Sequence, residues 1–278
     1  MQVDSGGVGI HVDIHGPDGG VPVLLLHGWP DTGRLWSKQI GPLGDAGYRV
    51  IVPDQRGYGR SDKPEAVDSY SVAFLAADVV AVLDAAGVEQ AHVVGHDWGA
   101  AVAWAVASFM PERVDRLAVL SVGHPLAFAA AGLPQRELSW YMLLFQFEDI
   151  AEQWLSADGW ANFRAWSCHP DADAVTAELE ADGSLTPGLS WYRANVHPRT
   201  LVAPRLELPK VAAATMGVWS TGDKHLTEQQ MTGSAEHVAG PWRYERLDGP
   251  GHWMQWEAPD QVTALLLDHL GGGEPARE

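Results

Sequence analysis

The chain has one cysteine, Cys168, among 278 residues. A single thiol cannot form an internal disulfide, and this pattern is typical of proteins in a reducing compartment. We therefore predict a cytoplasmic location, with Cys168 as a small buried apolar side chain. The first nine residues contain no basic segment followed by an apolar run, so we expect no secretory signal.

Basic residues are also scarce, because 18 lysines and arginines face 36 aspartates and glutamates, and the formal net charge is −18. Nucleic acids and anionic membranes attract proteins with a positive field, so this excess of acid argues against both as partners. The longest stretches without charge, such as 99–111, are shorter than the roughly 20 apolar residues that span a bilayer. We therefore predict binding to neither nucleic acid nor a membrane.

The hydrophobic content of 46% is high enough to bury a large core, and the length fits one catalytic domain with an insertion. Apolar strand-like segments in the first half alternate with amphipathic helical ones. The strand-like segments are 9–15, 22–26, 48–52, 91–94 and 116–121, and the helical ones are 34–43, 72–86 and 100–107. Strands separated by helices predict an α/β fold with a mostly parallel, doubly wound sheet.

The pattern changes from about Leu126 to Pro209, where tryptophans and helix formers occur without a clear strand. This segment is typical of an inserted helical cap. Strand-like segments return at 215–220 and 242–247, and an amphipathic helix follows at 259–270. We therefore predict a core of 1–125 and 210–270, a cap of 126–209 and a flexible tail of 271–278.

The segment Gly95-His96-Asp97-Trp98-Gly99 has the form of a nucleophile elbow, but aspartate stands where hydrolases usually have serine. A serine that opened an epoxide or displaced a halide would form an ether, which water does not readily cleave. Aspartate forms an ester, which an activated water can hydrolyse beside an oxyanion hole. The residue type therefore favours displacement at a saturated carbon over lipase or peptidase chemistry.

Polar groups that can work with Asp97 follow other predicted strands, at the edge where ligands bind in a doubly wound sheet. Strand 22–26 leads into His27-Gly28-Trp29-Pro30, so the backbone amides of Trp29 and Trp98 can form the oxyanion hole. We interpret His27 as structural.

The predicted general base is His252, in the glycine-rich loop after the last predicted strand, and Asp223 after strand 215–220 orients it. Nucleophile, acid and histidine then follow the chain order of an α/β hydrolase. Asp248 is a rival for the acid, but it lies in the same loop as the histidine and more readily shapes that turn.

The chain resembles the α/β-hydrolase-fold epoxide hydrolases, in the compact form of the bacterial soluble members. The segments that carry the resemblance are His27-Gly28-Trp29-Pro30, Asp54-Gln55-Arg56-Gly57-Tyr58-Gly59-Arg60-Ser61, Gly95-His96-Asp97-Trp98-Gly99 and Gly251-His252. In that family two cap tyrosines hold the epoxide oxygen, and the resemblance implies Tyr141 and Tyr192. We further predict an apolar substrate pocket lined by Trp29, Trp98, Trp140, Phe145 and Trp191.

The activity that follows is hydrolysis of an apolar epoxide to a vicinal diol, with no metal and no cofactor. A haloalkane dehalogenase of the same fold is the first alternative, because it would use the same aspartyl ester and Trp98 can donate to a halide. A non-catalytic small-molecule receptor is the second, because a fold alone does not imply catalysis. The sequence leaves open whether the protein is a monomer or a homodimer.

Overall fold

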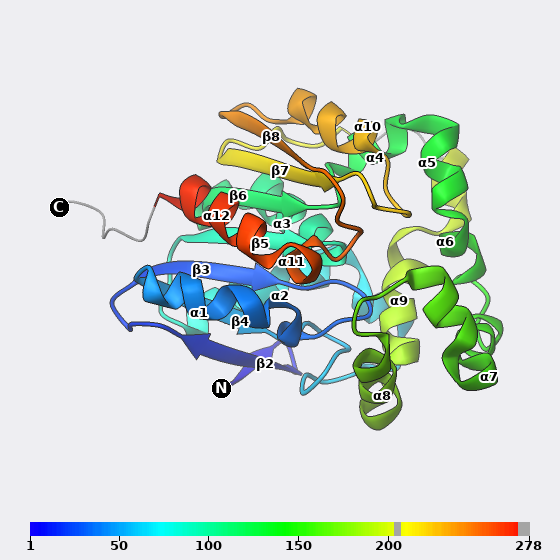
Figure 1. Cartoon of the computed structure of the whole chain (residues 1–278). Coiled ribbons are helices and arrows are strands. Elements are labelled where there is room, and N and C mark those ends of the chain that lie inside the picture. The colour runs from blue at the N-terminus through cyan, green and yellow to red at the C-terminus, as the bar shows by residue number, and fades with distance from the viewer. Residues whose placement is uncertain (203–206, 272–278) are drawn as a thin grey trace.

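The chain folds around an eight-stranded sheet (Figure 1). The computed structural model describes residues 1–202 and 207–271. The strands are β1 (Gln2–Ser5), β2 (Val8–His15), β3 (Val21–Leu26), β4 (Tyr48–Pro53), β5 (Ala91–His96), β6 (Val114–Leu120), β7 (Ala214–Ser220) and β8 (Trp242–Leu247).

The strand order across the sheet is β1-β2-β4-β3-β5-β6-β7-β8. The pairs β1-β2 and β2-β4 are antiparallel, and every pair from β4-β3 to β7-β8 is parallel. This confirms the predicted α/β fold with a mostly parallel sheet. The carboxyl ends of β3 to β8 therefore share one edge, and the predicted catalytic residues follow these strands.

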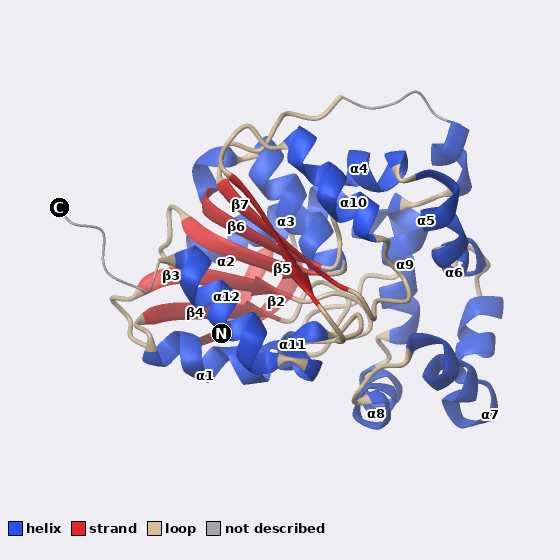
Figure 2. Cartoon of the chain, turned by 45° about the horizontal axis from the view of Figure 1, so that its top comes forward, coloured by secondary structure: helices blue, strands red, loops and turns tan. Residues whose placement is uncertain are grey.

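Both faces of the sheet are covered by helices, which explains why its central strands are continuously apolar (Figure 2). Successive residues point to opposite faces, so Val93 of β5 belongs to one apolar cluster and Val94 to the other. The helices α2 (Val72–Ala85) and α3 (Trp98–Phe109) cover the first face, and α1 (Ser37–Asp45), α11 (Met254–Glu257) and α12 (Pro259–Leu270) cover the second. Burial on both sides fixes the strands that carry the site.

Helices also fill the described residues between β6 and β7, the segment predicted as the cap. They are α4 (Pro125–Ala130), α5 (Gly132–Leu138), α6 (Trp140–Leu144), α7 (Ile150–Ser167), α8 (Ala172–Asp182), α9 (Leu185–Asn195) and the 3₁₀ helix η4 (Pro198–Val202). Helix α7 is interrupted at Ala157–Trp160 by non-helical backbone. Figure 1 shows α5 to α9 beyond the ends to which the parallel strands point, so these helices stand over the edge that carries Asp97.

The remaining short elements connect these layers. They are α10 (Glu228–Thr232) and the 3₁₀ helices η1 (Gly33–Trp36), η2 (Val67–Tyr70), η3 (Pro111–Arg113) and η5 (Gly233–His237). The predicted helix 34–43 is therefore a 3₁₀ turn followed by α1. Among the described helices, none is both long and apolar enough to cross a membrane.

Two expectations differ from the structure, and a third lies outside the described residues. Strand β1 was not predicted, because its four residues are mostly polar and only alternate ones are buried. Cys168 is not buried: it is exposed at the end of α7, where its left-handed backbone ends the helix. Of the tail predicted to be flexible, 271–278, only Gly271 is described.

Candidate active site

Asp97 occupies the sharp turn between β5 and α3. Its backbone has a φ of 51° and a ψ of −122°, a conformation that residues with side chains rarely adopt. Gly95 is needed two residues earlier, because a β-carbon there would collide with the backbone of Gly99. This is the geometry of a nucleophile elbow, which presents the carboxylate at the carboxyl edge of the sheet.

The two carboxylate oxygens of Asp97 have different surroundings. Oδ1 accepts a hydrogen bond of 3.0 Å from the backbone amide of Trp29, in the loop after β3. The amide of Trp98 opens α3 beside the same carboxylate, since a β-carbon on Gly28 would touch both groups. Oδ2 lies 3.7 Å from Nε2 of His252. The structure thus places both predicted oxyanion-hole residues around one side of Asp97 and the predicted base on the other.

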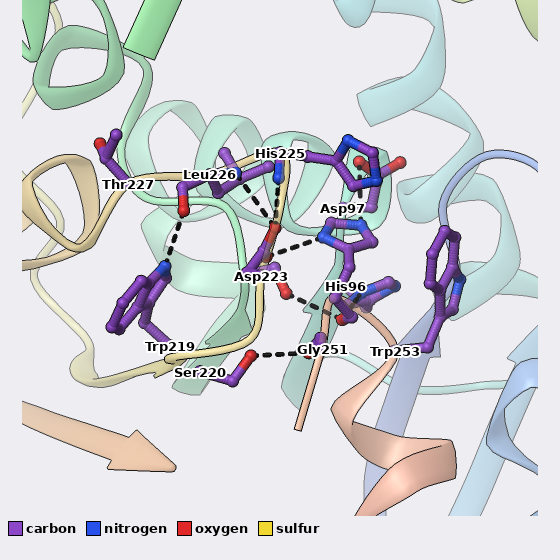
Figure 3. A network of polar contacts seen from close by, with 12 residues as sticks. His96, Asp97, Trp219, Ser220, Asp223, His225, Leu226, Thr227, Gly251 and Trp253 are labelled. Carbon is purple, nitrogen blue, oxygen red and sulfur yellow. Dashed lines mark hydrogen bonds and ion pairs between the residues drawn. The ribbon is translucent and has the colours of Figure 1, made fainter. Parts of the chain in front are cut away.

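His252 is held by the other carboxylate that the sequence singles out. Its Nδ1 lies 2.9 Å from Oδ2 of Asp223. The second oxygen of Asp223 accepts hydrogen bonds from the backbone amides of His225 at 2.8 Å and Leu226 at 3.0 Å (Figure 3). These bonds fix the carboxylate, which in turn fixes the tautomer and the ring orientation of His252. The rival acid Asp248 is elsewhere, with an exposed side chain paired to Arg246 at 3.1 Å.

The charged groups around His252 determine whether its imidazole ring is protonated. Burial lowers the pKa of this imidazole, but Asp223 and then Asp97 raise it, and the result is a pKa of about 10. His252 is therefore an imidazolium at neutral pH. An ester on Asp97 would remove one of the two negative charges that raise this pKa.

We expect NMR titration of the resting protein to show His252 as an imidazolium up to about pH 10. Its ring resonances are assigned as those that His252→Gln removes. Asp97→Ala should lower this pKa, because it removes a negative charge beside Nε2, whereas Asp248→Ala should leave it unchanged. A wild-type His252 that titrates near 6.5, the value of an unperturbed histidine, would contradict the charge arrangement.

The two predicted cap tyrosines pack edge-on against each other, and both lie close enough to Asp97 for its charge to act on them. Tyr141 on α6 and Tyr192 on α9 are both buried, and their ring centroids are 6.0 Å apart. Burial and then the negative charge of Asp97 raise both pKa values well above the usual value of 10. Both phenols are therefore protonated at neutral pH and can donate hydrogen bonds to an oxygen that gains negative charge.

Aromatic side chains surround these polar groups. The Tyr192 ring lies 5.1 Å from the ring of Trp98, 5.0 Å from that of Phe145 and 6.2 Å from that of Trp29. Trp191 is fully buried at the seam between α9 and the core, with its ring 5.8 Å from Trp98. Such surroundings suit an apolar molecule with one polar reacting group.

Known proteins share this architecture over nearly the whole chain. A family model described as the alpha/beta hydrolase fold matches residues 21–259. The chain belongs to the α/β-hydrolase fold family. Epoxide hydrolase A of Mycobacterium tuberculosis is 34% identical over 98% of this chain and 97% of its own length. The AB hydrolase superfamily protein YfhM of Bacillus subtilis is 34% identical over 96% of both chains.

A solved structure agrees with these relatives. The crystal structure of Epoxide Hydrolase A from Mycobacterium thermoresistibile is 32% identical, with a TM-score of 0.82 over 99% of this chain and 98% of that one. The predicted resemblance of this α/β hydrolase to bacterial epoxide hydrolases is confirmed.

One predicted pocket residue of this α/β hydrolase lies elsewhere. Trp140 is 47% exposed, and its ring packs edge-on against Trp154 on the outer side of the predicted cap. Successive residues of a helix are about 100° apart, so the inward direction of Tyr141 turns Trp140 outward. Its assignment to the substrate pocket was wrong because tryptophan content alone carries no direction.

Sequence reasoning missed a further buried carboxylate near the site of this α/β hydrolase, Asp31. Its oxygens accept hydrogen bonds from Trp253 Nε1 at 2.9 Å and pair with His169 Nε2 at 3.2 Å. Burial raises the pKa of Asp31, but His169 and then Trp253 hold it below its usual value. The available signal was position, because Asp31 directly follows the Trp29-Pro30 pair and Trp253 directly follows His252. His169 belongs to the predicted cap, so this cluster joins the cap to the core beside the base.

The remaining polar groups near the site have simpler roles. His27 is buried and its Nε2 accepts the backbone amide of Gln55 at 2.9 Å, which fits the predicted structural role. Within residues 1–202 and 207–271, no three His, Cys, Asp or Glu side chains are grouped as a metal ligand set.

Proposed function

We propose that this protein converts an apolar epoxide and water into a vicinal diol through a covalent ester on Asp97. The observation that carries the proposal is one buried site in which the charge of Asp97 acts on two protonated phenols, Tyr141 and Tyr192. Relatives named epoxide hydrolases support an epoxide as the substrate. In this proposal the segment 126–209 is the cap that closes over the substrate.

The first half-reaction opens the ring. Oδ2 of Asp97 attacks a ring carbon while the carbon–oxygen bond breaks, because Oδ1 is already engaged by the Trp29 amide. The epoxide oxygen becomes an alkoxide, which Tyr141 and Tyr192 stabilise and to which one of them supplies a proton. The proton released as the pKa of His252 falls restores that phenol, so charge balances across the step.

The second half-reaction hydrolyses the ester. Neutral His252, oriented by Asp223, removes a proton from water as the water oxygen attacks the ester carbonyl. The amides of Trp29 and Trp98 hold the resulting oxyanion. Collapse returns Asp97 as a carboxylate, the diol leaves with the last proton, and His252 is again an imidazolium. The cycle therefore ends in the state in which it began.

The alternatives are weaker on particular grounds. Trp29 Nε1 is buried without a hydrogen-bond partner and can donate to a halide, which keeps the haloalkane dehalogenase as the second candidate. A dehalogenase has no need for the phenol pair above the nucleophile. A receptor that does no chemistry has no need for Asp97, His252 and Asp223 to lie as close to one another as they do.

The location of the protein is a separate proposal. The exposed thiol of Cys168 supports a reducing compartment, and we propose the cytoplasm.

The test of the proposed function is a single turnover with excess enzyme and styrene oxide in water enriched in ¹⁸O. We expect the first diol to be unlabelled and the peptide that contains Asp97 to carry the label, because water attacks the ester carbonyl. Label in the first diol would mean that water attacks the ring directly. No diol from the epoxide, together with halide release from a haloalkane, would instead establish the dehalogenase.

A further inference from the structure

We propose that His96, Ser121 and Ser220 are positioning residues for the catalytic base, and we name them the His252 clamp. They hold the main chain of the loop that carries His252 rather than its ring. The inference rests on the proposed function, since it assigns these three residues to the ester-hydrolysis step.

The clamp consists of three hydrogen bonds to two successive carbonyl groups. The carbonyl oxygen of His252 accepts from His96 Nε2 at 3.0 Å and from Ser121 Oγ at 3.1 Å. The carbonyl oxygen of Gly251 accepts from Ser220 Oγ at 2.6 Å (Figure 3). His96 ends β5, Ser121 follows β6 and Ser220 ends β7, so three neighbouring strands each direct one donor at the loop.

The loop itself needs external support because of its composition. Gly249, Pro250 and Gly251 precede His252 and offer little side chain for packing. The amide of Gly251 donates to Glu257 at 2.9 Å, so both the amide and the carbonyl group of this residue are hydrogen-bonded. A base that works within hydrogen-bond range tolerates little displacement, and a misplacement of 1 Å can cost about 100-fold in rate.

His96 is suited to be a permanent donor. Its Nε2 must carry the proton because the partner is a carbonyl oxygen, and its Nδ1 is buried without a partner. Burial and then the charge of His252 lower its pKa to about 4, so the ring stays neutral at physiological pH. The ring also lies 4.6 Å from the His252 ring, centroid to centroid. Burying the unpaired Nδ1 of this histidine costs free energy of folding, so we infer that the hydrogen bond made by Nε2 has a function.

Ser121 adopts a backbone that favours glycine. Its φ is 67°, yet it is serine, and its side chain is fully buried. The same residue donates its amide to Val218 O at 2.9 Å, and its carbonyl accepts from Gln230 Nε2 at 2.8 Å. Neighbouring groups thus hold the unusual backbone while the hydroxyl reaches His252. Glycine would fit this backbone at least as well, so the hydroxyl is what distinguishes serine here.

The clamp predicts a split between the half-reactions. In ring opening Asp97 and the phenols act on the substrate and His252 only returns a proton to a phenol, whereas ester hydrolysis needs the His252 ring placed beside the attacking water. We expect Ser121→Gly and Ser220→Ala each to slow ester hydrolysis about 10-fold and the double variant about 100-fold, with ring opening changed less than about twofold. Ester should accumulate on Asp97 in proportion, as measured by rapid quench with styrene oxide and intact-protein mass spectrometry.

The controls separate positioning from general damage. Ser121→Gly removes the hydroxyl without imposing strain, so its melting temperature should not fall. Ser108→Ala removes a buried hydroxyl on α3 that has no hydrogen-bond partner, and it should leave both half-reactions unchanged. Ser220→Thr keeps the hydroxyl and should restore hydrolysis.

Two results would overturn the clamp: hydrolysis at the wild-type rate in the double variant, or equal slowing of both half-reactions. Failure of the proposed function looks different, because His252→Gln would then form no ester at all.

Discussion

Asp97→Ala should abolish turnover of styrene oxide, with a loss of roughly 10⁴-fold or more in kcat/KM. The reason is the absence of any second nucleophile at the elbow: the neighbouring amides and phenols stabilise charge but cannot form the ester. Steady-state assays of diol formation measure the effect, and mass spectrometry should detect no adduct.

The control for this variant is Asp248→Ala. It also removes an aspartate four residues from His252 in the sequence, but that side chain is exposed and serves no step of the proposed cycle. We expect activity within about twofold of wild type, because isolated surface charges contribute little. A strong loss in Asp248→Ala would make Asp248 the acid partner of His252 in place of Asp223. Substantial diol formation by a folded Asp97→Ala protein would remove Asp97 from the mechanism.

His252→Gln should stop the cycle half-way, with the ester accumulating on Asp97. General bases contribute about 10²- to 10⁴-fold, so we expect ester hydrolysis to slow by about 10³-fold. Glutamine cannot accept the proton from water, yet the Asp97 carboxylate remains able to attack. The protein mass after mixing with excess styrene oxide should rise by one substrate and stay raised for minutes.

The matched control is His11→Gln, which changes a histidine of strand β2 that pairs with Asp13. It should form no lasting adduct and turn over normally. Normal turnover by His252→Gln would show that another group is the base, and His225 would be the next candidate because its ring lies 5.5 Å from that of His252.

The residues that follow the predicted strands allowed the candidate site to be predicted from the sequence. A parallel sheet brings the residues after its strands to one edge, so residues that are 126 to 155 positions apart, as Asp97 is from Asp223 and His252, were paired from sequence alone. The central strands were equally predictable from the sequence, because burial on both faces of the sheet produces uninterrupted runs of apolar residues. The edge strand β1 lacks that signal, since only one of its faces is covered.

The direction and burial of individual side chains were not predictable in the same way. Trp140 and Tyr141 are adjacent in sequence, and which of them points inward depends on how α6 packs, which no local pattern states. Cys168 was expected inside because cysteine is often buried, but it caps the end of α7 in solvent. The Asp31–His169 pair joins residues 138 apart, and tertiary packing alone brings them together.

The unequal surroundings of the two Asp97 oxygens have a consequence over successive cycles. As long as the Trp29 amide keeps Oδ1 in place, the oxygen delivered by water takes the position of Oδ2, and Oδ2 is the attacking atom of the next cycle. Each diol then contains an oxygen atom from the water consumed one cycle earlier. In the proposed cycle the Asp97 carboxylate therefore passes an oxygen atom from the water of one turnover to the diol of the next.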